Sequence, residues 1–518
     1  MYNKINLDTP YNKIIIHILQ NIAIFFNSFS FYKRCMFIIC CGIGAFTPFL
    51  FGQYTWHDPQ YSMILFEYSW LDMIKTIAAE DGHPPLSYII FRMFQFGYDT
   101  HTVWTLRLCE LFFIVLTTLL GMFPVRRLLG DKIALYYVIL SLILPPAFIL
   151  STNLRMYPLA VYFVTAAFIY SFCIIYKYKQ HDWLKFSLVS ILGLYTHYYC
   201  AFILLFIWLF LFVNLCISKQ IANLKKFFIF GFIVSLSFLP WILIFINQYT
   251  VMKEAWYPSM KSVEEAYKGL FFINGGIVYN LKTVVFICAS FSWFLIIQTA
   301  LEHTPYNIYN KICITCILIT WILFLLLWLI SVFLRPVSVE LYFIIFVGLV
   351  YISLAISLSL HKKLSILYMV CCIFIYINIY PYAYKDVFDT SNDAAINYIN
   401  NKIPNNSLFL YDNTHRHLFL RFYANKYKIY YAPSFRELVL LQNEVINEKQ
   451  NIKNLKDYEA IYYLRTPNKF DAYNKTNTFD EIAFKGFIMR KLSINEALNV
   501  INKSNLLRKA NLAITDDN

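Results

Sequence analysis

Long apolar stretches, separated by short polar connections, fill the chain from about residue 35 to about residue 384. A helix needs about 20 consecutive apolar residues to cross the hydrocarbon core of a membrane. About eleven stretches approach or exceed that length with few or no charges, at about 35–54, 104–124, 133–152, 156–176, 184–197, 199–218, 227–247, 280–300, 312–334, 341–360 and 364–383. Only the polar residues at 195–198 divide the fifth stretch from the sixth. The pattern predicts an all-α polytopic membrane domain with about eleven transmembrane helices.

The first 34 residues are less uniformly apolar. Residues 14–31 carry interspersed polar side chains, among them His17, Gln20 and Asn21. This mixture favours an amphipathic helix that lies on the membrane surface, with a twelfth span as the alternative. The stretch is too polar for a cleaved signal peptide and lacks a small-residue cleavage site.

The composition changes again at about residue 385, where Asn, Lys, Asp and Glu become frequent and long apolar runs end. Residues 391–403 have the character of a helix, and Ser434 with Glu437 forms a capping box that opens another. Short β-type runs lie at 407–411, 428–432, 459–465 and 486–492. Strands that alternate with helices predict a small α/β domain over residues 385–518.

Basic residues in the short connections predict the orientation, because they concentrate on the cytoplasmic side. They fall on one side of the predicted spans, at positions 33, 34, 126, 127, 132, 177, 179, 185, 219, 225, 226, 311, 362 and 363. Residues 1–34 are then a cytoplasmic segment and residues 35–384 the membrane domain. The first loop, at 54–103, and residues 385–518 are external.

The composition narrows the possible functions. The chain is 59% hydrophobic and only 14% charged, whereas soluble domains are about one quarter charged. Its net charge of +14 comes from residues between the apolar stretches, which argues against a nucleic-acid-binding face. All twelve cysteines lie in or beside apolar stretches, so we interpret them as packing residues. Cys313 and Cys316 form a C-x-x-C without partner ligands, and we expect no metal and no cofactor.

The first external loop carries the most informative polar residues. Asp58 directly follows the first span, and Pro59 disfavours a helical conformation for it. A carboxylate there is either a base for chemistry at the membrane surface or an ordinary solvated acid. His83 precedes two prolines, which fix the backbone beside Asp81 and open an amphipathic stretch at 86–96. Asp81 and His83 therefore either bind substrate or belong to a turn before an interfacial helix.

These motifs follow one another in the order W-x-D, S-W-x-D-x-I, D-G-H-P-P-L, L-R-x-x-E, L-R-M-Y, Y-T-H-Y, L-P-W and R-P. Over residues 35–380 that order resembles the GT-C superfamily of glycosyltransferases. The similarity is to the bacterial branch related to protein O-mannosyltransferases, aminoarabinose transferases and lipopolysaccharide galacturonosyl transferases.

The resemblance implies an inverting transfer, in one displacement, of a sugar from a polyprenyl-phosphate donor to an external acceptor. Asp58 is then the general base, and the acceptor is lipid A, another glycan or a protein. The resemblance also implies a multi-pass protein of the bacterial inner membrane, with the active site and the C-terminal domain on the periplasmic side.

Two departures from the family pattern affect this expectation. The family commonly has Asp-Glu where this chain has Asp58-Pro59, so a second carboxylate would have to come from Glu67, Asp72 or Asp81. The family also often carries Arg-Tyr in the span after R-P, where this chain has Leu-Tyr at 341–342.

Further polar residues are predicted at the external ends of spans. Arg155 of L-R-M-Y is the first candidate for holding the donor phosphate, with interfacial snorkelling as the alternative. Tyr157 of the same motif and His197 are substrate-binding candidates, although His197 also suits an aromatic belt. Arg335 is a second phosphate candidate. Arg107 and Glu110, three residues apart on one span, are expected to pair structurally.

Two other classes of function remain open. A transporter or flippase of lipid-linked sugars is the main alternative, but such proteins tend to show internal repeats and polar residues near the bilayer midplane. We find no repeat, and the charges gather at the predicted outer rim. A receptor is the third possibility, with a cluster in the external domain at Asp412, His415, Arg416 and His417 that could bind a glycan or a metal. We favour a solvated turn between a strand and a helix for that cluster.

Overall fold

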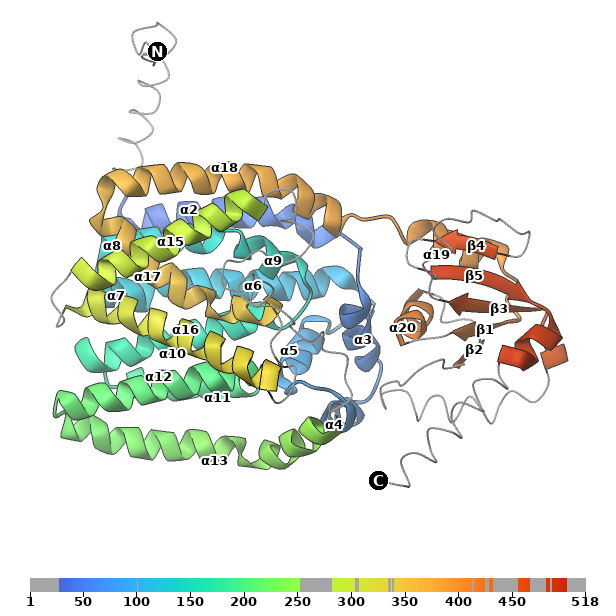
Figure 1. The fold of residues 1–518 in the computed structure, drawn as a ribbon, viewed down its shortest axis with the longest axis horizontal. Helices are drawn as coiled ribbons and strands as arrows, with labels where there is room; N and C mark the ends of the chain where they lie inside the picture. Colours follow the sequence, from blue (N-terminus) through green and yellow to red (C-terminus); the bar gives the residue numbers. More distant parts are fainter. Residues whose placement is uncertain are drawn as a thin grey trace, which may run out of the picture. The chain divides into compact units, whose positions relative to one another are not determined.

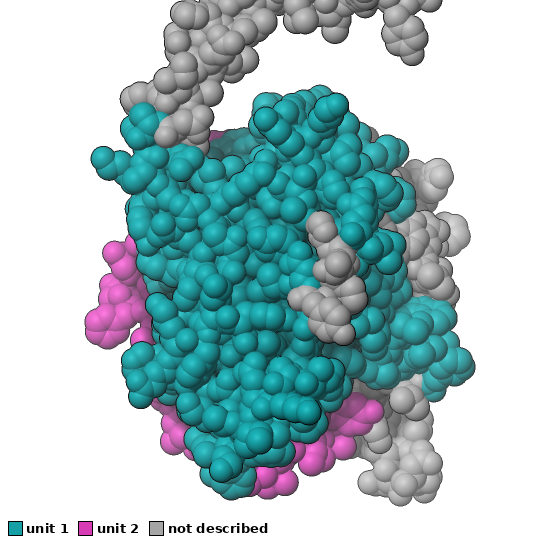
Figure 2. All heavy atoms as spheres, turned by 90° about the vertical axis from the view of Figure 1, so that its left-hand side faces the viewer, with its two compact units in different colours: residues 1–51, 107–238, 257–383 teal, residues 52–106, 239–256, 384–518 magenta. Residues whose placement is uncertain are grey.

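The structure is a computed structural model that describes residues 28–99, 101–251, 282–302, 307–333, 337, 340–411, 414–423, 428–431, 455–465, 481–484 and 487–500. The chain divides into two compact units, which Figure 2 distinguishes by colour. The first, the membrane unit, comprises residues 1–51, 107–238 and 257–383. The second, the loop-and-sheet unit, comprises residues 52–106, 239–256 and 384–518. The first loop and the C-terminal segment thus share one unit.

Every predicted span coincides with helix. The helices and helical turns are α2 (Phe31–Phe46), η1 (Thr47–Phe51), α6 (Val103–Leu120), η2 (Gly121–Val125), α7 (Arg126–Leu129), α8 (Asp131–Ile143), α9 (Pro146–Thr152), α10 (Tyr157–Tyr176), α11 (Asp182–Leu194), α12 (Tyr198–Ile217), α13 (Ile221–Val251), α15 (Lys282–Glu302), α16 (Ile308–Phe333), η5 (Glu340–Phe346), α17 (Val347–Leu360) and α18 (Lys362–Val387) (Figure 1). Among the described residues, nine helices are long and apolar enough to cross a membrane, or ten if the bent pair α8–α9 counts as one span. The chain is a multi-pass membrane protein.

One predicted span is bent, and another is too short to cross the hydrocarbon core. The stretch at 133–152 bends by 54° between α8 and α9, where Pro145 and Pro146 interrupt the helical hydrogen bonds. The stretch at 184–197 is α11, which has only thirteen residues. At 1.5 Å per residue α11 extends about 20 Å, less than the roughly 30 Å hydrocarbon core.

α17 lies at the centre of the membrane unit, packed against α8, α10, α15 and α16. Its residues are buried from Val347 to Ser359. α13, by contrast, exposes many large apolar side chains, as expected of a helix that faces lipid. Close packing of α17 on α10 depends on Gly348, because a Cβ at this position would lie 1.6 Å from Thr165 Oγ1.

We expect Gly348→Ala to destabilise the protein by about 1–3 kcal/mol, because the added methyl group overpacks this helix contact. The thermal unfolding midpoint of the purified protein in detergent measures the loss. Adding Thr165→Gly should restore part of the stability. Gly44→Ala on α2 is the control, since a Cβ there meets nothing within 4 Å. Equal midpoints for the Gly348→Ala and Gly44→Ala variants would contradict the contact.

The loop-and-sheet unit contains a five-stranded mixed sheet. Its strands are β1 (Ser407–Tyr411), β2 (Lys428–Tyr431), β3 (Ala460–Arg465), β4 (Glu481–Phe484) and β5 (Phe487–Leu492), in the order β2-β1-β3-β5-β4 (Figure 1). β1 runs parallel to β2 and β3, and β5 runs antiparallel to β3 and β4. Alternate residues of β1 enter two separate apolar clusters, so both faces of this strand are buried.

The predicted fold class, an α-helical membrane domain with a C-terminal α/β domain, is confirmed. Strands at 407–411, 428–432, 459–465 and 486–492 correspond to β1, β2, β3 and β5, and helix α19 (Asp393–Lys402) lies within the predicted 391–403. Strand β4 and helix α20 (Thr414–Tyr423) were not predicted. Most of the predicted N-terminal surface helix, the capping box at Ser434 and the side chains at 412–417 lie outside the described residues.

Candidate functional site

Three short helices form the first loop: α3 (His57–Leu65), α4 (Trp70–Glu80) and α5 (Leu86–Phe94). The prediction that Asp58 is not helical is wrong, because Asp58 lies in the first turn of α3. Pro59 is tolerated there since the first N–H groups of a helix have no partner within it. The helix dipole favours a carboxylate at this end. The Asp58 side chain is 33% exposed, and Oδ1 lies 3.2 Å from His57 Nε2.

Asp81 and His83 form a dyad, as their proximity in the sequence suggested. His83 Nδ1 lies 2.9 Å from Asp81 Oδ1, and Tyr88 on α5 donates its hydroxyl proton to Asp81 Oδ2. Asp81 is buried, and both of its carboxylate oxygens are engaged. This geometry suits a carboxylate that orients an imidazole and fixes which nitrogen carries the proton. Asp81 is therefore better suited to positioning His83 than to contacting substrate itself.

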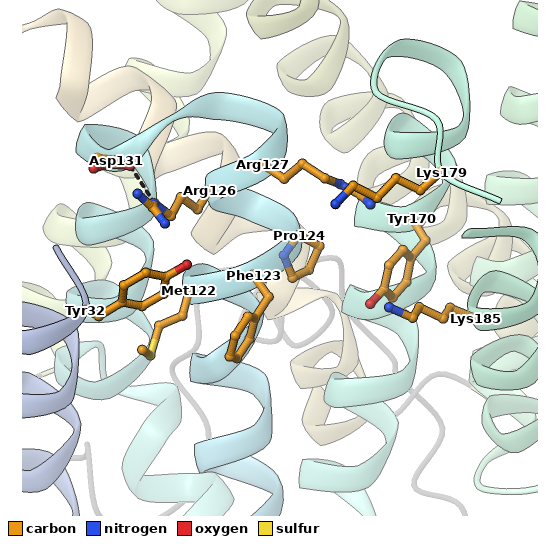
Figure 3. A pocket seen from close by; sticks show the side chains of 10 residues that line it. All are labelled: Tyr32, Met122, Phe123, Pro124, Arg126, Arg127, Asp131, Tyr170, Lys179 and Lys185. Atoms are coloured by element: carbon orange, nitrogen blue, oxygen red, sulfur yellow. Dashed lines mark hydrogen bonds and ion pairs between the residues drawn. The ribbon is translucent and has the colours of Figure 1, made fainter. Parts of the chain in front are cut away.

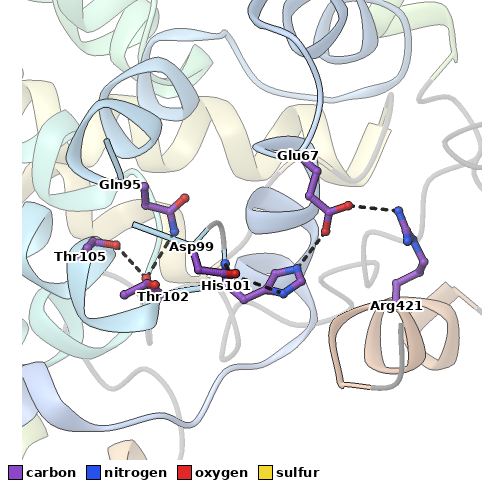
Figure 4. Close-up of polar contacts among 7 residues, drawn as sticks. All are labelled: Glu67, Gln95, Asp99, His101, Thr102, Thr105 and Arg421. Carbon is purple, nitrogen blue, oxygen red and sulfur yellow. Dashed lines mark hydrogen bonds and ion pairs between the residues drawn. The ribbon is translucent and has the colours of Figure 1, made fainter. Parts of the chain in front are cut away.

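Glu67 connects the first loop to the C-terminal segment (Figure 4). Its Oε1 lies 2.9 Å from His101 Nε2, and its Oε2 lies 3.3 Å from Arg421 Nη2 of α20. The backbone N–H of His101 also donates to Asp99 Oδ1. Since both Glu67 oxygens are engaged, this carboxylate is a poor second base. Asp72 is 63% exposed, and its Oδ2 accepts a hydrogen bond from Ser69, the N-cap residue of α4. Asp72 is therefore a poor second base too.

A second contact packs α20 against α3. The hydroxyl groups of Thr55 and Tyr423 lie 3.0 Å apart, and Gln60 donates to the Thr55 carbonyl. Burial raises the pKa of Tyr423, so its hydroxyl stays protonated for this bond. The helix that begins at Asp58 is therefore supported by a segment more than 350 residues later in the chain.

In the membrane unit, Glu110 supports the backbone that carries Arg155. Glu110 is fully buried on α6, and its Oε1 accepts the Arg155 N–H at 3.1 Å. The Leu154 N–H also donates to this carboxylate, and Leu154 has a left-handed backbone (φ 58°) after a right-handed Asn153. Successive N–H groups in that arrangement form a concave anion-binding nest. The predicted partner Arg107 acts on Glu110 electrostatically.

Arg155 lies directly before α10 and is only 6% exposed. Tyr157 begins α10, and its ring centroid lies 6.1 Å from that of His197. His197 caps α12, where its Nδ1 accepts the Tyr199 N–H at 3.1 Å. A neutral His197 ring therefore carries its proton on Nε2.

Tyr342 completes this aromatic group, with centroids 4.8 Å from His197 and 4.9 Å from Tyr199. The sequence showed Tyr342 only as the second residue of Leu-Tyr, where the family often has Arg-Tyr, and that match to the family tyrosine was the signal for it. The structure brings Tyr157 and His197 together in the membrane unit and Asp81 and His83 together in the other unit. Arg335 lies outside the described residues. Within the described ranges, no three His, Cys, Asp or Glu side chains gather closely enough to hold a metal ion.

Comparison with solved structures identifies the fold. The crystal structure of ArnT from Cupriavidus metallidurans in the apo state matches 89% of this chain and 98% of its own, with a TM-score of 0.58 and 10% identity. ArnT bound to undecaprenyl phosphate matches 88% of this chain and 97% of its own, with a TM-score of 0.57 and 10% identity. This chain has the GT-C fold.

The oligosaccharyltransferase of Archaeoglobus fulgidus is also among the matching solved structures. That protein in its apo form gives a TM-score of 0.46 and 11% identity over 83% of this chain and 69% of its own. No protein-family model and no curated protein matches the chain by sequence. The GT-C fold is therefore established from structure, at an identity too low to assign individual residues.

Proposed function

We propose that this protein is a membrane glycosyltransferase that moves a sugar from a polyprenyl-phosphate donor to an acceptor outside the bacterial inner membrane. The observation that carries the proposal is Asp58, an accessible carboxylate at the start of a helix in the first loop of a GT-C fold. The likeness to ArnT, which has been crystallised with undecaprenyl phosphate, supports a lipid-phosphate donor.

In the proposed reaction, Asp58 removes a proton from the acceptor nucleophile as that atom attacks the anomeric carbon of the sugar. The bond between this carbon and the donor phosphate breaks. The phosphate oxygen takes the bonding electron pair, and the phosphate leaves while still attached to the lipid. One displacement inverts the anomeric centre. The proton remains on the Asp58 carboxylate until solvent removes it. A positioned base of this kind contributes about 10²–10⁴-fold to the rate.

The leaving phosphate needs positive charge or hydrogen-bond donors, which usually supply the larger share of catalysis. We assign this task to Arg155, whose backbone is fixed by Glu110. His197, with its Nε2 proton, supplies a further donor. His83, whose Nδ1 is paired with Asp81, donates from Nε2 only as the imidazolium. Arg335 remains a further phosphate candidate and Tyr157 a substrate contact. The acceptor remains one of three classes: lipid A, another glycan or a protein.

Mass spectrometry of envelope glycolipids and glycoproteins tests the function without assuming the acceptor. We expect cells that lack the gene to lose one sugar modification and cells complemented with it to regain that modification. The lost mass identifies the sugar and the acceptor together. The opposite result has two parts: the glycans are unchanged in cells that lack the gene, and a labelled lipid-linked sugar moves across the membrane of vesicles that contain the protein without forming a covalent product. In that case the protein is a transporter.

A further inference from the structure

A basic pocket lies in the membrane unit at the end of α10 opposite Arg155. Its cavity volume is about 530 Å³. Figure 3 shows the side chains that line it. Arg155 precedes α10 and Lys179 follows it, and twenty helical residues separate the two ends by about 30 Å. The pocket is therefore a different site from the one proposed for sugar transfer.

Four cations line the pocket, Arg126, Arg127, Lys179 and Lys185, against one lining carboxylate, Asp131. Asp131 pairs with Arg126 Nε at 2.6 Å, which leaves the four N–H donors on the two Nη atoms of that guanidinium outside the pair. Behind the lining, Asp182 is buried and pairs with Arg127 Nη2 at 2.8 Å. The cations outnumber the carboxylates, so the pocket favours an anion.

The arginines are held in place by their neighbours. The Arg126 guanidinium lies 4.6 Å from the ring centroids of both Phe31 and Tyr32, at the start of α2. Such stacking orients the cation without neutralising it. The π-helical turn η2 supplies Met122, Phe123 and Pro124 to the lining. Single π-helical turns often occur at functional sites, because the wider turn displaces the helix wall.

Apolar side chains adjoin the charged pocket. Phe123 lines it and is 59% exposed, and Tyr32 lines it and is also exposed. Met36 and Phe37, further along α2, are exposed as well. A soluble phosphate compound has no apolar part that could pack against these side chains, whereas the acyl chains of a lipid can pack along them.

We propose that this pocket binds the headgroup of an anionic phospholipid. Its phosphodiester lies among Arg126, Arg127, Lys179 and Lys185, and its acyl chains run past Phe123 along α2. Basic pockets between membrane helices bind such headgroups on the cytoplasmic side, where the surplus of Lys and Arg in the connections predicts this end to lie. The site needs neither Asp58 nor a sugar donor, so it stands independently of the proposed function.

Native mass spectrometry of the full-length protein in detergent tests the site, with phosphatidylglycerol and phosphatidylcholine of identical acyl chains as probes. We expect the wild type to prefer phosphatidylglycerol. Hydrogen bonds from a lysine ammonium to a phosphate are stronger than those from a neutral glutamine amide, so Lys179→Gln/Lys185→Gln should weaken phosphatidylglycerol binding roughly 30-fold. Thermal unfolding midpoints identify any variant that fails to fold.

Lys362→Gln/Lys363→Gln is the matched control, since both lysines are exposed on α18 and neither lines the pocket. We expect it to bind phosphatidylglycerol within about twofold of the wild type, because its charges act only through the screened surface potential. Equal losses in the two double variants, or no loss in the first, would overturn the site. Displacement of the lipid by millimolar sn-glycerol 3-phosphate would overturn the lipid assignment in favour of a soluble phosphate compound.

Discussion

Asp58→Asn is expected to lower sugar transfer about 100- to 10,000-fold, the usual contribution of a positioned base. The amide keeps the size of the side chain but cannot accept the proton of the acceptor. Asp58 is one third exposed, and its backbone conformation is compatible with asparagine, so we expect unchanged folding. Transfer by the purified variant, with the acceptor that the envelope comparison identifies, measures the effect.

Asp72→Asn provides the control for this variant. It removes one negative charge from the same unit, from a carboxylate that is 63% exposed on α4. We expect transfer close to the wild-type rate, with at most a small loss of helix-capping stability. Near-normal turnover by Asp58→Asn would remove Asp58 from the role of base. Equal losses in both variants would indicate a general charge effect.

Arg155→Met is expected to weaken the binding of undecaprenyl phosphate about 10- to 100-fold. Hydrogen bonds from a cation to a phosphate are worth about 1.5–3 kcal/mol each. Arg155→Lys should fall between the wild type and Arg155→Met, because lysine retains the charge but not the planar, two-pronged guanidinium. Lipid-binding titrations of the purified proteins in detergent measure all three affinities.

Arg490→Met is the control for the Arg155 variants, because Arg490 lies on strand β5 and pairs there with Glu496, a residue that follows the strand. Affinity equal to the wild type in this control, together with a graded loss at position 155, is the expected pattern. Because Arg155 is buried, Arg155→Met can also fail to fold, and the charge-retaining lysine variant then decides. An Arg155→Lys protein that folds and binds as tightly as the wild type would exclude bidentate phosphate binding by Arg155.

The membrane helices could be predicted from sequence because crossing a bilayer is a local requirement on length and hydrophobicity. The same local signal did not show the bend at Pro145. Strand β4 was missed because two of its four residues, Glu481 and Ala483, are of types depleted in strands, whereas the equally short β2 is rich in Ile and Tyr. Both errors arise where single residues outweigh the average hydrophobicity.

The local error at Asp58 has a different cause. The rule that a residue before proline avoids helix is weakest in the first helical turn, where the missing proline N–H costs nothing. The sequence located the chemistry-bearing residues Asp58 and His83 but not the conformation of the first. It could only partly show which of them act through others, as Asp81 does on His83.

Contacts between distant segments could not be predicted at all. Arg421 and Glu67 are 354 residues apart. The support of Arg155 by Glu110 depends on the left-handed conformation of Leu154, a residue type that rarely adopts it. No periodicity or motif encodes such pairs. They follow only from the folded path of the chain.

The packing of α20 on α3 has a consequence for shortened forms of the protein. Removing residues 384–518 would uncover the Thr55 hydroxyl and break the ion pair between Glu67 and Arg421. α3, which carries Asp58 in its first turn, would then lose its packing against α20, even if the C-terminal segment never contacts a substrate. An inactive truncated protein could therefore have a displaced Asp58 or could lack a surface that binds the acceptor. Single substitutions at Arg421 or Tyr423 distinguish these two causes, because they remove the contacts to the first loop but keep the rest of the C-terminal segment.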